Sequence, residues 1–247
     1  MFRFLFIFIL TCFSCMTTAS SWRELAPGIK YRDMGSNKLL PWSHIHTFKI
    51  DLKLNEFGIV MANDYSRNAA SIQQFSKYSQ ALITINGGFF DQRYKPLGLR
   101  VSHRQEQSSL KQISWWGVFY INNQRAYLTN WQRYIRNNLT DFAVQSGPRL
   151  LMNGKILPLK PGFSERTALG ITPNNRVIVL VSENSPMSTR DLAKLLQAPP
   201  LNCTHAINLD GGSSSQLNAN IGNFNIHVQG FSKVSDAIII KARTAQS

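Results

Sequence analysis

The chain contains 247 residues, 43% of them hydrophobic, and carries a formal net charge of +14. A chain of this length can bury one sizeable core, so we expect a single folded domain without an interdomain linker. The positive charge favours acidic partners through long-range attraction. Nucleic acid is not an expected partner, because the chain has no basic run and no recognised nucleic-acid-binding motif.

The N-terminus has the composition of a signal peptide. Arg3 precedes an apolar run over residues 4–10 that is too short to span a bilayer. Small residues at positions 17–19 predict cleavage after Ala19, so residues 1–19 are the expected signal. The exported chain is then expected to be secreted or periplasmic, with no stable membrane span.

The three cysteines bear on whether the exported protein is soluble or lipid-anchored. Cys12 and Cys15 raise the alternative of a lipid-anchored protein, but neither lies in a good lipid-attachment sequence, so we favour the soluble interpretation. Removal of the signal would leave Cys203 as the single cysteine, and an internal disulfide could not form. We expect Cys203 to be a buried small hydrophobe and not a nucleophile.

Residues 20–44 are mixed in composition and punctuated by prolines, which predicts an irregular segment wrapping the domain. Alternating apolar residues over 46–54 then predict a half-buried strand, with residues 57–61 as its hairpin partner. Apolar residues three apart predict a short amphipathic helix over 71–79. A buried strand over 81–85 follows and ends at Asn86.

The rest of the chain is typical of strands joined by short turns. Further strands are predicted over 115–121, 125–128, 141–145, 166–172, 176–182, 204–209 and 237–240. Helices are predicted over 130–136 and after Ser188, where the sequence resembles a capping arrangement. Strands outnumber helices, so we expect an α+β fold: one domain over 45–241, with a largely antiparallel or mixed sheet and a few short helices.

Two of the predicted strands end in paired glycines. The strand over 204–209 leads into an acidic, glycine-rich and serine-rich turn, and the strand over 81–85 leads into a second glycine pair. Glycines let a ligand approach the main chain closely, while Asn, Asp and Ser supply polar atoms. Two strand ends of this design predict one shared pocket, formed by Asn86, Gly87, Gly88, Asp210, Gly211, Gly212, Ser213 and Ser214.

With two further segments, these motifs resemble the phosphodiester glycosidase family. The additional segments are Ser-Gly-Pro-Arg-Leu-Leu at 146–151 and Glu-Arg-Thr-Ala-Leu-Gly at 165–170, and the order and spacing of all four fit one domain. The resemblance implies a hydrolase that cleaves a sugar-1-phosphodiester at the anomeric carbon and leaves a phosphomonoester. Its expected substrate is a phosphorylated glycan or another sugar-1-phosphodiester.

Asp210 and Arg166 are the expected catalytic residues. Asp210 could act as a nucleophile, as a general base, or as a stabiliser of positive charge at the anomeric carbon. The guanidinium of Arg166 can grip two oxygens of a departing phosphate. The alternatives are an aspartate that only hydrogen-bonds its own turn and a surface arginine that pairs with Glu165.

The remaining motif residues are expected to bind substrate. Asn86 would bind a substrate hydroxyl or orient Asp210, and its two following glycines would clear space. The glycine-serine turn would offer N–H and hydroxyl groups to an anion. Ser146 and Gly147 would complete the wall of the pocket. These expected substrate-binding residues are Asn86, Gly87, Gly88, Ser146, Gly147, Gly211, Gly212, Ser213 and Ser214.

No cofactor and no metal are expected, because no acidic loop has ligand spacing and the histidines form no zinc set. Two other functions compete with the glycosidase. One is a non-catalytic envelope protein that binds anionic, phosphorylated glycans through the same pocket. The other is a phosphodiesterase that attacks phosphorus, which would normally show a two-metal cluster of carboxylates and histidines.

Overall fold

The computed structural model describes residues 21–35 and 40–244, in which strands dominate and every pairing between named strands is antiparallel. The first sheet has eight strands in the order β1 (Arg23–Ala26), β2 (Ile29–Asp33), β3 (His44–Asp51), β15 (Arg176–Glu183), β14 (Thr167–Ile171), β17 (His205–Asn208), β11 (Arg149–Met152) and β12 (Lys155–Ile156). The second sheet has the order β7 (Gln105–Ser108), β6 (Arg100–Ser102), β10 (Thr140–Ser146), β8 (Gly117–Asn122) and β9 (Arg125–Thr129).

The third sheet has the order β19 (Phe224–Val228), β18 (Leu217–Ile221), β5 (Ile83–Asn86), β20 (Asp236–Ala242) and β4 (Asn55–Met61). A separate short pair joins β13 (Phe163–Ser164) to β16 (Met187–Ser188). The described helices are α1 (Ile72–Ser79), α2 (Thr189–Gln197) and the 3-10 turns η1 (Ala62–Tyr65) and η2 (Gly212–Ser214). The expected antiparallel architecture is confirmed, although strands outweigh helices more than the α+β prediction implies.

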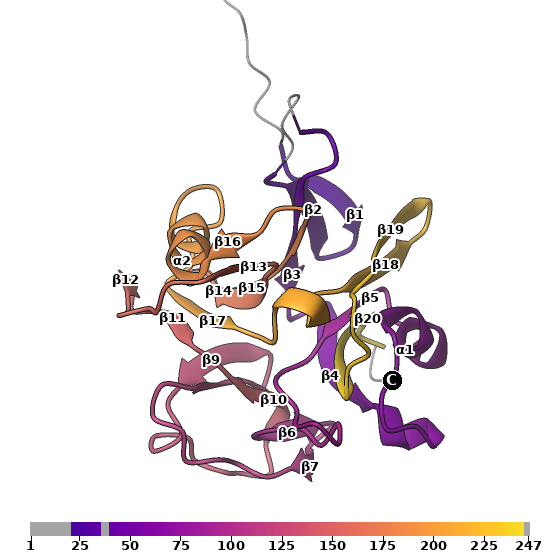
Figure 1. Cartoon of the computed structure of the whole chain (residues 1–247), viewed down its shortest axis with the longest axis vertical. Coiled ribbons are helices and arrows are strands. Elements are labelled where there is room, and N and C mark those ends of the chain that lie inside the picture. Colours follow the sequence, from indigo (N-terminus) through magenta and orange to yellow (C-terminus); the bar gives the residue numbers. More distant parts are fainter. Residues whose placement is uncertain (1–20, 36–39, 245–247) are drawn as a thin grey trace, which may run out of the picture.

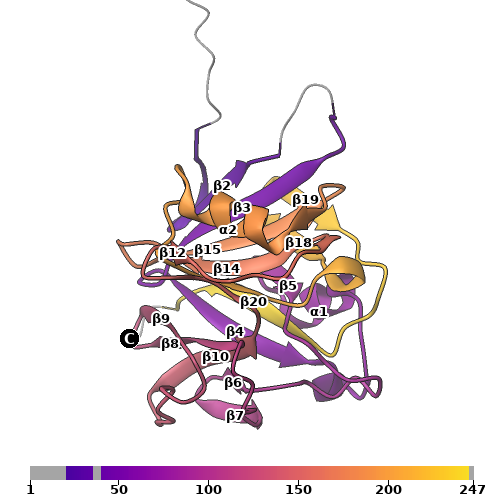
Figure 2. The same ribbon diagram turned by 60° about the vertical axis from the view of Figure 1, so that its left-hand side comes forward.

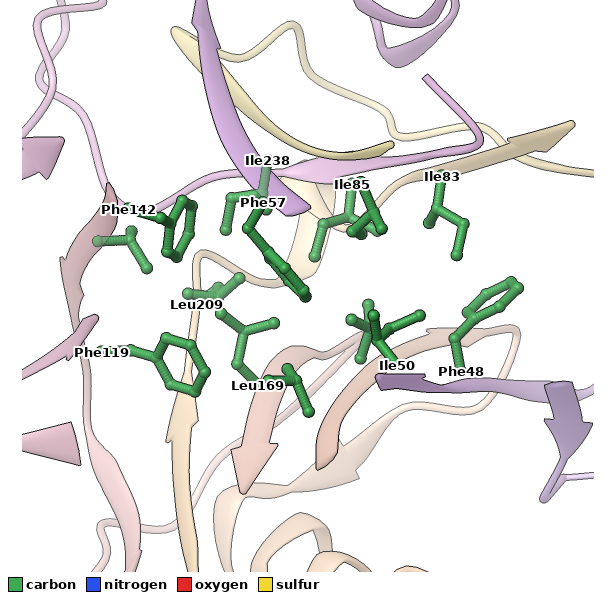
Figure 3. Packing of buried hydrophobic residues seen from close by; sticks show 14 of the residues in the cluster. Phe48, Ile50, Phe57, Ile83, Ile85, Phe119, Phe142, Leu169, Leu209 and Ile238 are labelled. Carbon is green, nitrogen blue, oxygen red and sulfur yellow. The ribbon is translucent and has the colours of Figure 1, made fainter. Parts of the chain in front are cut away.

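The main core lies between the first and third sheets, and the second sheet closes one side of it (Figures 1 and 2). Figure 3 shows Phe48 and Leu169 of the first sheet facing Ile85 of the third, with Phe119 and Phe142 of the second sheet beside them. The two-residue period of β3 produces this arrangement, because alternate side chains enter the core. The helices cover the outer faces: α2 packs on the first sheet and α1 on the third.

Both α-helices begin where the sequence predicts. Ser71 caps α1, accepting from the Gln74 N–H, and the Gln74 side chain accepts from the Ser71 N–H in return. Ser188 caps α2 by accepting a hydrogen bond from the Asp191 N–H. The strands predicted over 166–172 and 176–182 are present as β14 and β15, and the two pair as an antiparallel hairpin.

Three local predictions were wrong. Residues 57–61 form β4, which pairs with β20 and not with β3, because β2 and β15 occupy both edges of β3. Residues 130–136 make only turns: Asn130 accepts from Arg133 N–H, but no helix follows. The segment over 20–44, expected to be irregular, contains the β1–β2 hairpin and the start of β3.

The predicted signal peptide, residues 1–19, lies outside the described residues. Among the helices of residues 21–35 and 40–244, none is long and apolar enough to cross a membrane.

The cap of α2 can be tested by Ser188→Ala. We expect the free energy of unfolding to fall by about 1 kcal/mol, because the Asp191 N–H loses its acceptor. Urea denaturation measures this change. Ser109→Ala is the matched control, because Ser109 is exposed and outside any helix or strand. We expect it to change the stability by less than about 0.5 kcal/mol; equal losses would show that the cap contributes nothing specific.

Candidate active site

Asn86 holds the two glycine motifs together. Its side-chain nitrogen donates to the backbone oxygens of Asp210, at 2.8 Å, and Gly87, at 3.2 Å. Its side-chain oxygen accepts from the Thr167 hydroxyl at 2.8 Å and from the Gln216 N–H at 3.2 Å. These four bonds join the end of β5 to β14 and to the turn after β17. The two strand ends therefore meet, as the shared-pocket prediction requires.

This bonding corrects the expected role of Asn86. The side chain is fully buried, at 0% exposure, and all of its donors and acceptors are used inside the protein. Direct contact with a substrate hydroxyl is therefore wrong for this conformation. Its other suggested role, orienting Asp210, is the one that the geometry fits.

Gln216 fixes the same turn from the other side. Its side-chain oxygen accepts from the Ile72 N–H, at the start of α1, at 2.8 Å. Its side-chain nitrogen donates to the backbone oxygens of Ser214 and Ser232. Because Gln216 is only 1% exposed, the turn after Asp210 is tied to the core of the third sheet and to α1.

Asp210 follows this junction and is half-buried. One oxygen accepts from the Gly211 N–H at 3.0 Å. Burial raises the pKa of Asp210 above its ordinary value, and the charge of Asp236 behind it acts in the same direction. Hydrogen bonds from Ser214 and Gly211 and the charge of Arg100 oppose this rise in pKa. Asp210 is thus a partly desolvated carboxyl group on a rigid support.

Arg166 directly precedes β14 and lies beside the same turn. Its Nε donates to the Met187 oxygen at 2.8 Å and its Nη2 to the Gly162 oxygen at 2.7 Å. A Cβ placed on Gly211 would lie 4.0 Å from Arg166 Nη1, so this nitrogen lies beside the turn that carries Asp210. Burial lowers the pKa of the guanidinium from its ordinary value.

Glu165 does not pair with Arg166. Its carboxylate accepts from the Ser182 hydroxyl and from the Ser185 N–H, and its backbone oxygen accepts from the Gly212 N–H at 2.8 Å. The alternative of a surface Arg166–Glu165 ion pair is therefore wrong.

The glycine-serine turn is less available for an anion than the sequence suggests. The N–H groups of Gly211 and Gly212 are donated to the Asp210 carboxylate and the Glu165 oxygen. The Ser214 N–H is donated to the Gly211 oxygen, and Ser214 is buried. Ser213 is the exposed member of the turn. The expected anion cradle is thus largely closed by internal bonds, and Ser213 is left to contact solvent.

Ser146 and Gly147 lie beside the strand end that leads to Asp210. Both are buried, and a Cβ at Gly147 would lie 2.6 Å from Trp116 Cδ1. The Gly147 oxygen accepts from Asn208 Nδ2 at 3.2 Å, which supports the strand end just before Asp210. The Ser146 hydroxyl has no hydrogen-bond partner within the described residues, and substrate contact by Ser146 and Gly147 stays a prediction.

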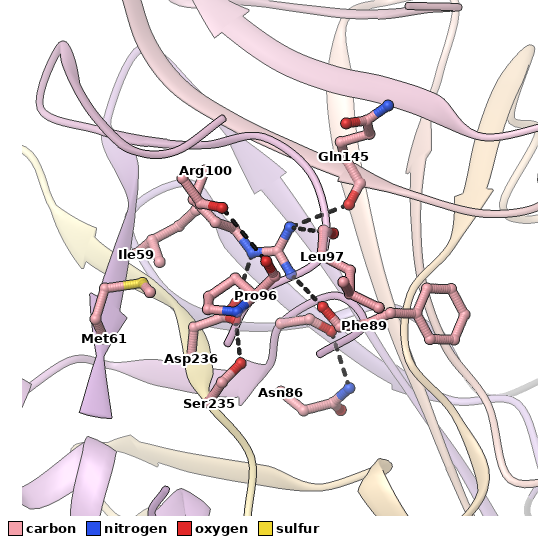
Figure 4. Close-up of polar contacts among 12 residues, drawn as sticks. Ile59, Met61, Asn86, Phe89, Pro96, Leu97, Arg100, Gln145, Ser235 and Asp236 are labelled. Atoms are coloured by element: carbon pink, nitrogen blue, oxygen red, sulfur yellow. Dashed lines mark hydrogen bonds and ion pairs between the residues drawn. The ribbon is translucent and has the colours of Figure 1, made fainter. Parts of the chain in front are cut away.

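Arg100 and Asp236 were missed by the sequence reasoning, although they shape the first glycine motif. Arg100 Nε donates to Asp236 Oδ1 at 2.9 Å, and both side chains are 0% exposed. Figure 4 shows the guanidinium also donating to backbone oxygens, including that of Phe89. A Cβ at Gly87 would overlap Asp236 Oδ1, and one at Gly88 would lie 2.7 Å from Arg100 Nη2. These glycines make room for the ion pair and not for a ligand, and no spacing in the sequence signals that pairing.

The residues that the structure describes bear on metal ligation and thiol chemistry. Among the described residues, no three His, Cys, Asp or Glu side chains cluster so as to hold a metal ion. Burial raises the pKa of the Cys203 thiol to about 12, which keeps it protonated and unreactive.

A match to the sequence pattern of the phosphodiester glycosidases extends over residues 79–241, which is more than half of the chain. The chain belongs to the phosphodiester glycosidase family. The matched span includes Asn86, Arg166 and Asp210, the residues that meet at the junction described above.

Solved structures show the same fold. The catalytic domain of zebrafish N-acetylglucosamine-1-phosphodiester alpha-N-acetylglucosaminidase, auto-inhibited by its pro-peptide, matches with a TM-score of 0.67 at 17% identity. That match covers 91% of this chain and 87% of the zebrafish chain. A hypothetical protein from Synechocystis has a TM-score of 0.65 at 16% identity, over 91% of this chain and 64% of that one. At these identities the likeness concerns the fold alone.

One curated protein is related in sequence. YigE of Escherichia coli (strain K12), an uncharacterised protein, is 29% identical over 154 residues. The alignment covers 58% of this chain and 60% of YigE, so the chain matches somewhat under two thirds of that relative's length.

The buried ion pair leads to a stability prediction. Asp236→Asn should lower the free energy of unfolding by about 3 to 5 kcal/mol, because it leaves Arg100 charged and buried without its carboxylate. Asp141→Asn is the control: it breaks an ion pair with Arg104, whose side chain is 62% exposed, and should cost less than about 1 kcal/mol. Chemical denaturation compares the two, and equal losses would contradict the assigned role of the buried pair.

The raised pKa of Asp210 leads to a second prediction, for Asp210→Asn. Because the pKa of Asp210 is higher in the folded than in the unfolded protein, ionisation of its carboxyl group lowers the stability of the fold at any pH above the folded-state pKa. This loss of stability disappears when the pH falls below 3.8, the ordinary pKa of the group. We therefore expect Asp210→Asn to melt at a higher temperature than the wild type at pH 7, with the difference shrinking towards pH 3. Melting curves across this range measure it. A variant that melts lower than the wild type at pH 7 would contradict the desolvation argument.

Proposed function

We propose that this protein is an exported hydrolase that cleaves a sugar-1-phosphodiester at the anomeric carbon and leaves a phosphomonoester on the second partner. Family membership supports phosphodiester glycosidase chemistry. The observation that carries the proposal is that Asp210 and Arg166 both lie at one turn. The side chain of Asn86 holds this turn by a hydrogen bond to the Asp210 backbone oxygen. The zebrafish relative's name gives the same class of bond, an N-acetylglucosamine-1-phosphodiester.

Asp210 suits the sugar side of this bond. Cleavage at the anomeric carbon passes through an oxocarbenium-like centre, which carries developing positive charge. A carboxylate in a partly desolvated position stabilises such charge more strongly than one in water, and a fixed backbone avoids reorganisation during the reaction. The bonds from Asn86 and Gln216 provide that fixed backbone.

Arg166 suits the phosphate side. Two of its nitrogens are fixed by backbone oxygens, which leaves Nη1 beside the Asp210 turn with its orientation set. A guanidinium in this position can hold the negative charge of the departing phosphate. Because phosphate is a competent leaving group, the site depends little on a strong general acid. One carboxylate and one guanidinium are then sufficient for the proposed division of roles.

We also propose that residues 1–19 are removed on export, that residues 45–241 form the catalytic domain, and that the protein acts outside the cytoplasm, in the periplasm or after secretion. A phosphorylated glycan is the substrate class that fits the positive net charge, which falls from +14 by one, to +13, when Arg3 leaves with the signal.

Hydrolysis in oxygen-18 water tests the proposal. The purified protein is incubated with a panel of sugar-1-phosphodiesters, and the products are analysed by mass spectrometry. We expect the heavy oxygen on the released sugar and an unlabelled phosphomonoester, because water attacks carbon. Asp210→Asn should lose nearly all turnover, whereas Asp141→Asn, which lies outside the site, should keep it.

Three outcomes would contradict this function. Label in the phosphate would place the attack at phosphorus and exclude the glycosidase mechanism. Wild-type turnover in a folded Asp210→Asn variant would remove Asp210 from the chemistry. Release of neither product from any member of the panel would favour the non-catalytic protein that binds anionic glycans.

A further inference from the structure

A cavity of about 640 Å³ opens on the face of the first sheet that is turned away from the main core. Lys49 of β3 lies in its lining, while its neighbours Phe48 and Ile50 enter the core on the other face. The cavity is bounded by β1 and β2, by the turn after β14 and by the segment after α2. Its lining includes Trp22, Lys30, Lys49, Asn174, Arg176 and Asn202.

The cavity lies far from the candidate active site along β15. Arg176, at one end of this strand, lines the cavity, whereas Ser182, near the other end, bonds to Arg166 and Glu165. Six residues of strand separate the two, which corresponds to about 20 Å. The cavity is therefore distinct from the candidate active site.

The positive charges of the cavity are only partly neutralised. Lys30 and Lys49 stand directly opposite each other in the β2–β3 pair, an arrangement that is unfavourable for like charges. Arg176 pairs with Asp51 at 2.9 Å, and Lys30 has only a loose contact with Glu24 at 3.8 Å. Within the described residues, Lys49 has no carboxylate oxygen within 4.0 Å.

Lys49 is held in this position by Trp22. Its Nζ lies 4.2 Å from the centre of the indole ring, a cation–π contact. Burial, followed by the charge of Lys30, lowers the pKa of Lys49 from its ordinary value. The ammonium group is thus kept charged at an energetic disadvantage. A binding site for an anion gives a reason for this arrangement, because the ligand supplies the missing negative charge.

Two further donors around Lys49 and Lys30 also have no acceptor. Trp22 Nε1 and Arg32 Nε are buried, and neither makes a hydrogen bond within the described part of the chain. Trp22 lines the cavity, and Arg32 lies two residues from Lys30 on the same face of β2. Buried donors in native proteins normally have partners. Both nitrogens are shielded from solvent, so they add to the positive and polar surroundings of the two lysines without being exposed to the cavity.

We infer that this cavity binds a saccharide phosphate, with the phosphate on Lys30 and Lys49. The volume is within the usual range for a small-molecule site. Asn174 and Asn202 offer amide groups to sugar hydroxyls, and Trp22 offers an apolar surface. The inference does not depend on the proposed catalysis, because none of these residues belongs to the candidate active site.

Binding of glucose 6-phosphate, measured by isothermal titration calorimetry at low salt, tests the inference, with glucose as the uncharged comparison. We expect the wild type to bind glucose 6-phosphate and to show no measurable binding of glucose. Lys49→Met keeps the length of the side chain but removes its charge, and should weaken binding at least tenfold. Lys30→Met should also weaken binding, and it serves as the second variant if Lys49→Met does not fold.

Lys155→Met is the matched control. Lys155 is exposed on β12, at the far edge of the same sheet, so the change in net charge is the same while the cavity is untouched. Its affinity should stay within twofold of the wild type. Stronger salt should weaken wild-type binding, because the recognition is electrostatic.

The inference fails if the wild type does not bind glucose 6-phosphate, or if it binds glucose equally well. It also fails if Lys155→Met weakens binding as much as the cavity variants do, since the effect would then be that of net charge alone. Unchanged binding in folded Lys49→Met and Lys30→Met would place the ligand elsewhere. Because the measurement concerns affinity and not turnover, it stands apart from the test of the glycosidase function.

Discussion

The ion pair between Arg100 and Asp236 is the constraint on which the arrangement of the site depends. Arg100 belongs to the second sheet and Asp236 to the third, so the pair joins two sheets through a direct contact of 2.9 Å between fully buried side chains. A buried pair is tolerable only when its remaining donors and acceptors are also satisfied. Backbone oxygens around Arg100 and the hydroxyl of Ser235 meet this requirement. The chain between β5 and β6 must therefore run close to the guanidinium.

This requirement changes the meaning of the first glycine motif. Gly87 and Gly88 have the appearance of a ligand-binding turn, yet the space that they leave is filled by Asp236 and Arg100. Asn86 is likewise an internal connector, which ties β5 to β14 and to Asp210. The groups left accessible are fewer than the motif suggests: Asp210 is half-buried and Ser213 is exposed, whereas Arg166 is 9% exposed and lies beside the turn.

Local patterns predicted much of the fold, but not the pairing of distant strands. β3 and β15 could be found because alternate residues face a core, and α2 because Ser188 precedes an amphipathic run. The partner of β4 could not be found, because the paired residues of β20 lie 175 to 187 positions later in the chain. For the site, Asp210 and Arg166 could be selected by chemistry and motif. Arg100 could not, since its significance comes only from a carboxylate 136 residues later.

The bonds of Gln216 have a consequence for local motion. The same side chain caps the first N–H of α1 and holds the turn that follows Asp210. Opening of the turn therefore leaves the Ile72 N–H without its acceptor, and fraying of α1 removes one support of the turn. Segments coupled in this way tend to open as one cooperative unit. The turn that follows Asp210 then opens no more often than the first turn of α1. A bulky substrate must therefore bind beside a turn that keeps its conformation.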